Sequence, residues 1–527
     1  MANASRVAEQ EVKLGAHATF VMPDLVGAHG TGETGGGVAD GPGEGRPTVV
    51  DLGERTLTAT YWDTADLRLT RAGLSLRHRA ASDGSERVWT VKLPAVGGGL
   101  TLNRSEVTFD GPDGVPPAPA ADLVTATTRG RRLEPVARLV TRRRRRHVLD
   151  GEGRVALEVA DDEVSVMDGR RLAARFRELE VELAPGEHGG AALLPLVVSR
   201  LQGAGAGAPD PTAKIVRALG PRALAPPDVQ VGEVGPRSRA ADAVQAAIAT
   251  GTRRLVAHDP GVRLGGDDED VHQARVATRR LRSDLATFGP LLDEGWVDDV
   301  RGELAWLAEE LGVARDADVL LGRLRRQVSR LGGADAAAAA GLLQRLEAER
   351  AEARGRAAAA LATARYAALL DQLVAAGQMP PLTERAGRRA AEVVPGLVAK
   401  AWGHLARAVE QVDDDSPLEL LHEVRKKAKR CRYACEAATP VCAADAQKLG
   451  AAVAGIQEVL GDMQDAAVAE LWLRSRVVGL TGADAAGQAF AAGLLTALQQ
   501  QAGEQAIGSW RAAWEKASGK KLRKWLG

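Results

Sequence analysis

The stretch RELEVELAP, residues 177–185, alternates carboxylates with aliphatic side chains. Glutamate stands at 178, 180 and 182, and the positions between them carry Leu179, Val181 and Leu183. Successive side chains of a β-strand point to opposite faces of the sheet. The stretch therefore predicts a strand with one apolar face and one wholly acidic face. A solvated outer face usually mixes neutral polar residues with charges, so this acidic face needs another explanation.

Further segments show the same alternation, with bases as well as acids on the charged face. The charged residues are Glu9, Glu11 and Lys13; Arg77 and Arg79; Lys92; Arg104 and Glu106; and Glu158, which lies between two aliphatic residues. Almost wholly ionic faces on several strands favour a closed antiparallel sheet with a polar lumen over an exposed sheet. Carboxylates in such a lumen suit Mg²⁺ or Mn²⁺, while Arg and Lys suit the oxygens of a triphosphate.

Length and composition indicate a multidomain protein of the ordinary globular class. A chain of 527 residues exceeds one hydrophobic core. Its formal net charge is zero, so an anion site must be a local concentration of Lys and Arg. The three cysteines, at 431, 435 and 442, indicate reduced thiols rather than a disulfide framework. The sequence shows neither a signal peptide nor an apolar run that could cross a membrane, which predicts a cytoplasmic protein.

The chain changes character along its length, which predicts an α+β multidomain protein. Residues 5–220 read as short strands separated by turns, which predicts the β-barrel or tunnel. The glycine-rich stretch 27–45 is expected to be a flexible loop and lacks a phosphate-binding GxxxxGK[ST] pattern. Residues 221–236 form a Pro-rich linker, and residues 237–527 show the apolar spacing of helices.

Two basic patterns in the helical region match each other. We call each set of four a comb: His272, Arg275, Arg279 and Arg282 form the first, and His422, Arg425, Lys429 and Arg432 form the second. The offsets 0, +3, +7 and +10 place four side chains on one helix face over about 15 Å. A single comb is most simply a solvated face, but two matched combs indicate a binding surface for a long polyanion.

A second pair of motifs shows that the helical region is duplicated. LGVARDADV (311–319) follows the first comb and LGDMQDAAV (460–468) follows the second. The His272–Leu311 and His422–Leu460 intervals differ by a single residue. This agreement predicts two copies of one helical bundle, at about 237–378 and 379–527. The aspartates at 316, 318 and 465 are expected to pair with cations or cap helices rather than bind metal.

The N-terminal motifs resemble those of the CYTH domain, the family of triphosphate tunnel metalloenzymes. The resemblance is carried by ExExK (9–13), YWDTADLRL (61–69), GLSLRHR (73–79), VKLP (91–94), ELEVEL (178–183) and TAKIVRAL (212–219). It implies metal binding by Glu9, Glu11 and Glu158, with one or two of Glu178, Glu180 and Glu182. Asp161 or Asp162 could replace Glu158, since a one-residue shift is possible there.

The same resemblance implies which bases act on the phosphates. The catalytic set is Lys13, Arg77, Arg79, Lys92 and Arg143, and the substrate-binding set is Arg104, Arg145 and Lys214. Residues 142–146 are all Arg, so alternation allows only every second one to face inward. The match favours Arg143 and Arg145 over the alternative set at 142, 144 and 146.

The combs resemble the signatures of the CHAD domain, a conserved-histidine α-helical family associated with inorganic polyphosphate. The matching motifs are HQARVATRRLR (272–282) and HEVRKKAKRCRY (422–433). The resemblance implies two bundles with basic faces along a central cleft, and phosphate contact by all eight comb residues. Tyr433 has Ser283 as its counterpart and is expected to serve packing.

These expectations favour an enzyme. Its N-terminal domain is predicted to hydrolyse inorganic triphosphate or an organic triphosphate with Mg²⁺ or Mn²⁺, and its C-terminal domain to bind polyphosphate, including on polyphosphate granules. One alternative is a non-catalytic polyphosphate-binding or granule-targeting protein. Another is activity like that of class IV adenylyl cyclases, although no aromatic-rich adenine pocket is visible. Nucleic acid and membrane are not expected partners, because no motif for either is present.

Overall fold

The computed structural model describes residues 5–27, 45–94, 102–186, 189–413 and 416–527. The chain divides into two compact units, Met1–Asp228 and Val229–Gly527. The division falls inside the Pro-rich segment 221–236. The glycine-rich stretch 27–45, expected to be a flexible loop, lies outside the described residues apart from its two end residues.

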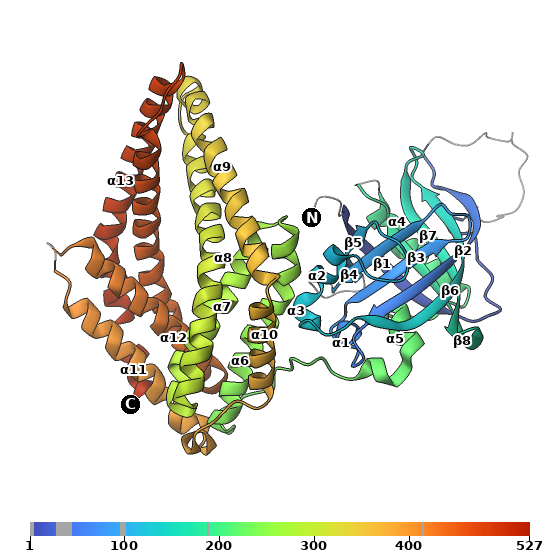
Figure 1. The fold of residues 1–527 in the computed structure, drawn as a ribbon, viewed down its shortest axis with the longest axis horizontal. Helices are drawn as coiled ribbons and strands as arrows, with labels where there is room; N and C mark the ends of the chain where they lie inside the picture. Colours follow the sequence, from blue (N-terminus) through green and yellow to red (C-terminus); the bar gives the residue numbers. More distant parts are fainter. Residues whose placement is uncertain (1–4, 28–44, 95–101, 187–188, 414–415) are drawn as a thin grey trace, which may run out of the picture. The chain divides into compact units, whose positions relative to one another are not determined.

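The first unit is a closed antiparallel barrel (Figure 1). The strands are β1 (Ser5–Ala16), β2 (Thr48–Asp63), β3 (Ser75–Ala81), β4 (Arg87–Leu93), β5 (Leu102–Phe109), β6 (Glu134–Leu149), β7 (Val155–Asp168) and β8 (Arg171–Leu183). They follow one another around the barrel in the order β1-β5-β4-β3-β2-β6-β7-β8, and β8 pairs with β1 to close it. The predicted tunnel architecture is therefore confirmed. Strand β6 contains the arginine run 142–146, for which the sequence had predicted an alternation between inward and outward positions.

The first unit also contains short helices. They are α1 (Arg68–Arg71), α2 (Ala118–Leu123), α3 (Thr125–Thr128), α4 (Gly190–Gly203), α5 (Lys214–Leu219) and the 3₁₀ helix η1 (Gly220–Leu224). Helix α4 covers the apolar outer face of β1, β7 and β8: its Val197 and Leu201 pack with buried Val12, Leu179 and Val181. The aliphatic half of each alternating strand therefore lies outside the barrel, which leaves the charged half for the lumen.

Helix α5 plugs one end of the lumen. Its Ile215 is 2% exposed and packs with Ala59, Tyr61, Leu139 and Val164. These apolar residues belong to strands β2, β6 and β7 and precede or follow the charged positions on the same strand face. The plug also brings the first residue of α5, Lys214, to the lumen.

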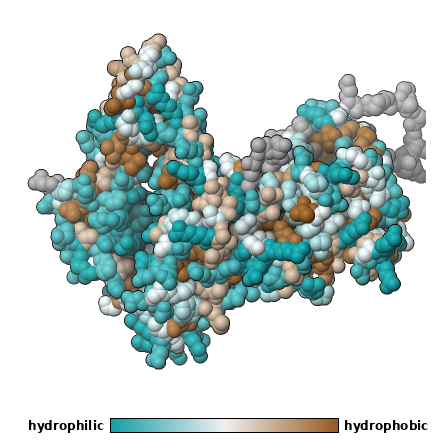
Figure 2. Space-filling view, viewed as in Figure 1, coloured by the Kyte–Doolittle hydropathy of each residue, from teal (hydrophilic) through white to brown (hydrophobic). Residues whose placement is uncertain are grey.

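The second unit is helical. Its long helices are α6 (Ala240–Leu264), α7 (Asp268–Phe288), α8 (Glu294–Val328), α9 (Gly333–Leu361), α10 (Ala364–Gln378), α11 (Ala390–Glu410), α12 (Leu418–Val477) and α13 (Ala485–Ala517). Shorter turns are η2 (Gly289–Leu291), η3 (Glu384–Gly387), α14 (Lys520–Arg523) and η4 (Lys524–Leu526). Its visible face is largely hydrophilic (Figure 2). Among the described helices, none has both the length and the hydrophobicity needed to span a bilayer.

The duplication is visible in helices α7, α8 and α12. Helix α12 is broken at Ala443, whose φ of 46° lies in the left-handed region, three residues after Pro440. The part before the break carries the second comb, as α7 carries the first. The part after it carries the second LG pair, as α8 carries the first. One copy thus separates its two helices with a short loop, and the other separates them with a kink.

Candidate functional site

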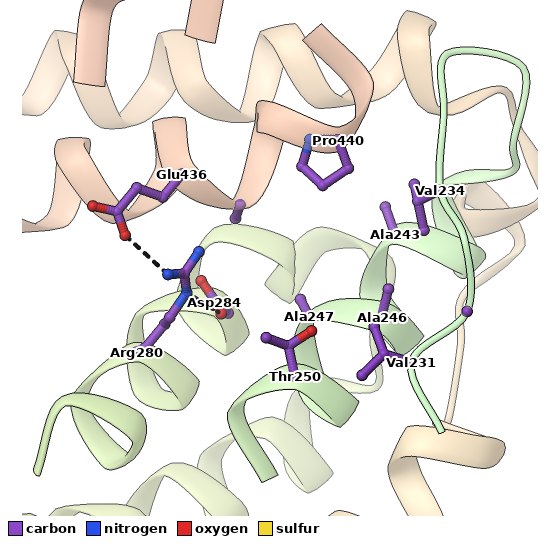
Figure 3. A pocket seen from close by; sticks show the side chains of 12 residues that line it. Val231, Val234, Ala243, Ala246, Ala247, Thr250, Arg280, Asp284, Glu436 and Pro440 are labelled. Carbon is purple, nitrogen blue, oxygen red and sulfur yellow. Dashed lines mark ion pairs between the residues drawn. The ribbon is translucent and has the colours of Figure 1, made fainter. Parts of the chain in front are cut away.

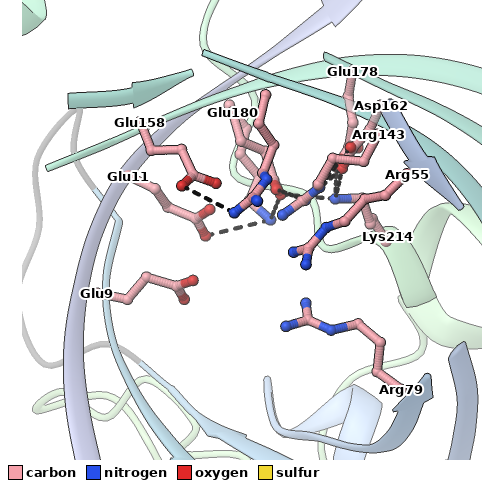
Figure 4. A network of polar contacts seen from close by, with 12 residues as sticks. Glu9, Glu11, Arg55, Arg79, Arg143, Glu158, Asp162, Glu178, Glu180 and Lys214 are labelled. Atoms are coloured by element: carbon pink, nitrogen blue, oxygen red, sulfur yellow. Dashed lines mark hydrogen bonds and ion pairs between the residues drawn. The ribbon is translucent and has the colours of Figure 1, made fainter. Parts of the chain in front are cut away.

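Neighbouring strands of the barrel bring acidic and basic side chains together in the lumen. Strand pairing sets Glu9 beside Arg104, Lys13 beside Glu180, and Asp162 beside Glu178. Residues paired in this way lie on the same sheet face. Figure 4 shows the resulting arrangement, in which Glu9, Glu11 and Glu158 point into a space that Arg55 and Arg79 enter from the other side.

The inner part of the lumen is a compact acidic cluster that is already neutralised. We call it the inner cluster: Asp162, Glu178 and Glu180, whose ligand atoms lie within 4.8 Å of one another. Lys214 Nζ lies 2.7, 3.0 and 2.9 Å from their carboxylate oxygens. Arg143 bridges Asp162 and Glu180 at 2.6 and 2.5 Å. Lys13 Nζ adds a contact to Glu180 at 2.9 Å.

The pKa values express this neutralisation. Burial would lower the pKa of Lys214, but the three carboxylates outweigh it and raise that pKa instead. Burial likewise disfavours the charged carboxylates, yet Arg143 and Lys214 hold the pKa of Asp162 below its usual range. The inner cluster is therefore a set of charged pairs in which a metal ion would have to displace a cation.

A second row of carboxylates is paired with cations less completely: Glu158 lies 3.6 Å from Arg145, and Glu11 lies 3.3 Å from Lys13. We call it the outer row: Glu11, Glu182 and Glu158, which are neighbours across β1, β8 and β7. Lys13 Nζ lies 3.3 Å from Glu11 Oε1, but that oxygen accepts no hydrogen bond from the described residues. Burial, with the charges of Glu9 and Glu11, raises the pKa of Glu182 to about 8. A divalent cation would relieve this repulsion, so the outer row fits Mg²⁺ or Mn²⁺ better than the inner cluster does.

Two further bases of the lumen, Lys92 and Arg77, contact the carboxylates of Glu9 and Glu106. Lys92 Nζ lies 2.6 Å from Glu9 Oε2 and 3.2 Å from Glu106 Oε2. Arg77 lies 3.5 Å from Glu106 and donates a hydrogen bond of 3.4 Å to the Tyr61 hydroxyl. The Lys92 and Arg77 charges overcome burial and lower the pKa of Glu106 to about 2. Arg77 and Lys92 therefore bring positive charge into the lumen beside the acids, which suits an elongated polyanion bound together with a metal ion.

A cleft in the second unit brings the two combs together. It is lined by His272, Arg275, Arg279, Arg315 and Arg323 from α7 and α8, with His422, Arg425, Lys429, Gln464 and Asp465 from α12. Three of the four members of each comb are therefore in one cavity. Arg282 and Arg432 do not line it. Instead, Arg432 pairs with Glu436 at 3.4 Å and stacks on Tyr433.

The cleft holds more positive charge than the acids around it offset. Arg275 lies 3.3 Å from Asp316, and His422 Nδ1 lies 2.7 Å from the side-chain oxygen Oε1 of Gln464. Burial, followed by the charges of Arg279 and Arg425, lowers the pKa of Lys429 to about 7. The further lowering by four neighbouring cations shows that positive charge predominates around Lys429, so the cleft favours an anionic ligand.

Comparison with known proteins places both sites in families. Residues 46–193 match the CYTH domain and residues 246–474 match the CHAD domain. An uncharacterised protein of Mycobacterium tuberculosis (strain H37Rv) is 33% identical over 477 residues, which cover 85% of this chain and 86% of the relative. This chain belongs to the CYTH–CHAD family. The CYTH triphosphate tunnel family includes triphosphatases and adenylyl cyclases, and CHAD domains are associated with polyphosphate.

Several solved structures are similar to parts of this chain. PptA from Streptomyces chartreusis is 25% identical, covers 53% of this chain and 100% of its own, and gives a TM-score of 0.44. The CHAD domain from the plant Ricinus communis is 26% identical, covers 55% and 96%, and gives a TM-score of 0.45. The protein HpAC1 from Hippeastrum, described as having a dominant triphosphatase activity, is 15% identical, covers 41% of this chain and 98% of its own, and gives a TM-score of 0.23.

The CYTH domain places most of the predicted residues on the lumen side. Arg143 faces the inner cluster, and Arg145 lies 3.6 Å from Glu158. Arg142 and Arg144 are on the outside, where both pair with Glu54. The parity favoured for the arginine run is thus the one observed. Arg104 donates to the carbonyl of Pro211 at 3.2 Å.

Some residues of the CYTH lumen escaped the sequence reasoning. Asp162, considered only as a substitute for Glu158, lies in the inner cluster, while Asp161 pairs with Arg177 at 2.8 Å. Arg55 projects into the lumen and lies 3.4 Å from Glu86. Its signal was the period-two continuation from Tyr61 back along β2 to position 55, which the intervening apolar residues obscured.

The CHAD domain likewise contributes unpredicted cations. Arg315 and Arg323 of α8 line the cleft with the combs. Arg323 also borders a neighbouring cavity together with Arg326 and Arg330. Tyr433 was expected to serve packing, and it is 1% exposed with the Arg279 guanidinium 5.4 Å above its ring. It therefore supports a cation of the other repeat.

Proposed function

We propose that the CYTH domain hydrolyses inorganic triphosphate or a related triphosphate with Mg²⁺ or Mn²⁺, and that the CHAD domain binds inorganic polyphosphate. The observation that carries the first half is the division of the lumen. The carboxylates of the outer row are incompletely paired with cations, and cations enter the lumen from the opposite wall (Figure 4). A triphosphate bound with a divalent cation complements both walls at once.

The proposal gives each group of residues a role. Glu9 and the outer row would hold the metal ion, which supplies charge neutralisation at the phosphoryl oxygens and polarises the attacking water. Arg77, Arg79 and Lys92 would hold the phosphates and stabilise negative charge that develops on the leaving group. Arg55, which the sequence did not indicate, is assigned the same role because it projects into the lumen. Lys13, Arg143 and Lys214, fixed by the inner cluster, would bind the innermost phosphate.

An assay panel tests the enzymatic half. Inorganic triphosphate, ATP, thiamine triphosphate and long polyphosphate are each incubated with Mg²⁺ and with Mn²⁺, and phosphate release is measured. We expect release from at least one triphosphate that is lost on chelation and in Glu11→Gln. Glu54→Gln is the matched control because the Glu54 side chain points to the outside of the barrel, where it pairs with Arg142. Absence of release under all conditions would reject the proposed hydrolysis.

Polyphosphate retention tests the CHAD half. The combined variant Arg279→Gln and Lys429→Gln removes two cations from the cleft, while Arg388→Gln removes one that is 59% exposed elsewhere. We expect the first to weaken binding of long polyphosphate by at least about tenfold and the second to leave it unchanged. Competition with RNA at matched salt distinguishes the polyphosphate proposal from nucleic-acid binding, because both lose affinity as salt is added.

A non-catalytic polyphosphate binder is the second candidate. It is favoured by one observation: Arg143 and Lys214 are already neutralised by the carboxylates of the inner cluster, so part of the lumen has no unpaired positive charge for a phosphate. In that case the protein would be retained on polyphosphate, including granules, through the CHAD cleft alone. The same panel separates the two candidates, since this one predicts binding without phosphate release.

A further inference from the structure

A small cavity in the helical unit lies apart from the comb cleft. Its volume is about 210 Å³, and its apolar lining comes from Val231, Val234, Ala243, Ala246, Ala247 and Pro440. Its polar lining includes Arg280 and Asp284 of α7 and Glu436 of α12 (Figure 3). None of these residues lines the cleft that contains the combs. The cavity is therefore a separate place where a ligand could bind.

Asp284 is an incompletely satisfied acid in this cavity. Its side chain is 2% exposed, and its Oδ1 accepts no hydrogen bond from the described residues. Arg280 Nε is 3.8 Å from Asp284 Oδ2, whereas Arg280 Nη1 is 3.1 Å from Glu436 Oε2. The guanidinium thus pairs more closely with Glu436. Burial raises the pKa of Asp284 to about 8, as expected for a carboxyl group without a close cation.

The composition of the cavity restricts its ligand. Glu436 contacts the guanidinium groups of both Arg280 and Arg432, whereas Asp284 lies 3.8 Å from Arg280, so an anion such as phosphate would meet Asp284 unfavourably. A cation that donates hydrogen bonds would satisfy Asp284 Oδ1 and favour the ionised form of this carboxyl group. The Ala, Val and Pro walls favour an aliphatic body, and the volume lies below that of typical sites for drug-sized ligands.

We propose that this cavity binds a small organic ammonium ion, with the ammonium group at Asp284 and Glu436 and a short aliphatic chain against the alanines of α6. Arg432 of the second comb also pairs with Glu436, at 3.4 Å. The ligand would therefore contact Glu436, which itself contacts Arg432, a residue predicted to bind polyphosphate. The site does not depend on catalysis in the CYTH domain.

Titration of the full-length protein with three probes of similar shape tests the proposal. Butylammonium, 1-butanol and butyrate are compared by ligand-observed NMR and by calorimetry. We expect butylammonium to bind in the millimolar range or more tightly, and the other two at least about tenfold more weakly. Equal binding of the alcohol, or no detectable binding of the amine, would overturn the proposal.

Two variants locate the binding in this cavity. Asp284→Asn keeps the shape of the side chain and should weaken butylammonium at least about tenfold, whereas Asp298→Asn, at a position 72% exposed, should not. If Asp284→Asn fails to fold, Ala247→Leu fills the cavity from α6 and should abolish binding. Unchanged affinity in a folded Asp284→Asn or Ala247→Leu protein would rule the site out.

Discussion

Arg275 lies directly against Gly312, so that a Cβ atom at Gly312 would come within 2.6 Å of Arg275 Nη1. The second repeat has the corresponding pair, with a Cβ at Gly461 lying 3.9 Å from Arg425 Nε. Both glycines belong to the LG pairs that revealed the duplication. At Gly312 the glycine has a physical reason, because it allows Arg275 to lie on the neighbouring helix and reach the cleft, whereas a Cβ at Gly461 would only touch Arg425.

Replacing Gly312 with alanine is expected to displace Arg275 and weaken polyphosphate binding. The atom in the way is the end of a flexible side chain, so the guanidinium should move while the backbone stays in place. Alanine also favours a helix by up to about 1 kcal/mol relative to glycine, so stability should not fall. We expect affinity to drop about three- to tenfold, measured by titration with polyphosphate, at unchanged or higher melting temperature.

Gly302 provides the control on the same helix, because nothing lies within 4 Å of a Cβ built there. Gly302→Ala should stabilise α8 and leave polyphosphate affinity unchanged. Gly461→Ala should have a smaller effect than Gly312→Ala, since 3.9 Å is ordinary van der Waals contact. If Gly312→Ala bound polyphosphate as tightly as Gly302→Ala, the positioning role of the glycine would be wrong.

Lys429 should make polyphosphate binding depend on pH. Its pKa of about 7 in the free cleft means that it loses its charge as pH rises through 7, whereas a bound polyanion favours the charged form. Binding above pH 7 must then take up a proton, which lowers affinity by up to about tenfold per pH unit. Between about pH 6 and about pH 8.5, we expect the affinity of the wild type for polyphosphate to fall more steeply than that of Lys429→Arg, because arginine keeps its charge throughout this range. Parallel pH profiles for the two proteins would contradict this assignment.

Sequence reasoning reached the lumen because the information was local. The alternation around Glu180 is a property of one strand, and it gives the lumen face whatever the neighbouring strands are. The division of acids into an inner cluster and an outer row was not predictable, because it depends on the register of β7 against β8. That register sets Asp162 beside Glu178 and Glu158 beside Glu182.

The combs illustrate the same limit in the helical unit. Helical spacing gave the face on which Arg279 and Lys429 lie, and the duplication correctly indicated that the two faces belong together. It could not show how far that shared surface extends. Arg282 is outside the lining of the cleft, whereas Arg323 of another helix is part of it. Which residues meet depends on how the helices cross, and spacing along one helix does not contain that information.

Glu182→Gln should stabilise the protein in the absence of metal. The pKa of Glu182 is raised to about 8 in the folded state against an ordinary 4.5, so the unfolded state loses its proton first as pH rises. Folding stability therefore falls between about pH 4.5 and pH 8, and the amide removes this loss. We expect a gain on the order of 1 kcal/mol at neutral pH, after allowance for partial solvent screening.

Chemical denaturation in chelator at several pH values measures that gain. The difference between Glu182→Gln and wild type should grow from pH 5 to pH 8 and then level off, following the window set by the raised pKa. Addition of Mn²⁺ should reverse the order by stabilising the wild type more than the variant, because the amide is a weaker ligand. A variant less stable than wild type in chelator at every pH would be incompatible with incomplete pairing of the carboxylates in the outer row.

Arg143 and Arg142 are adjacent in sequence but face opposite sides of the barrel, and this contrast gives the sharpest test of the lumen. Arg143 bridges Asp162 and Glu180, while Arg142 is 53% exposed and pairs with Glu54. Arg143→Lys keeps the charge but cannot make the two-armed contact, so the innermost phosphate position should be disordered. We expect kcat/KM for the active triphosphate to fall about ten- to a hundredfold, which corresponds to about 1.4–2.8 kcal/mol of transition-state stabilisation.

Arg142→Lys should leave kcat/KM within about twofold of the wild type, since an exposed pair contributes little. Equal losses in the two variants would mean that the inward face of β6 has no special part in the reaction, and the roles assigned to Lys13 and Lys214 around the same carboxylates would then lose their support.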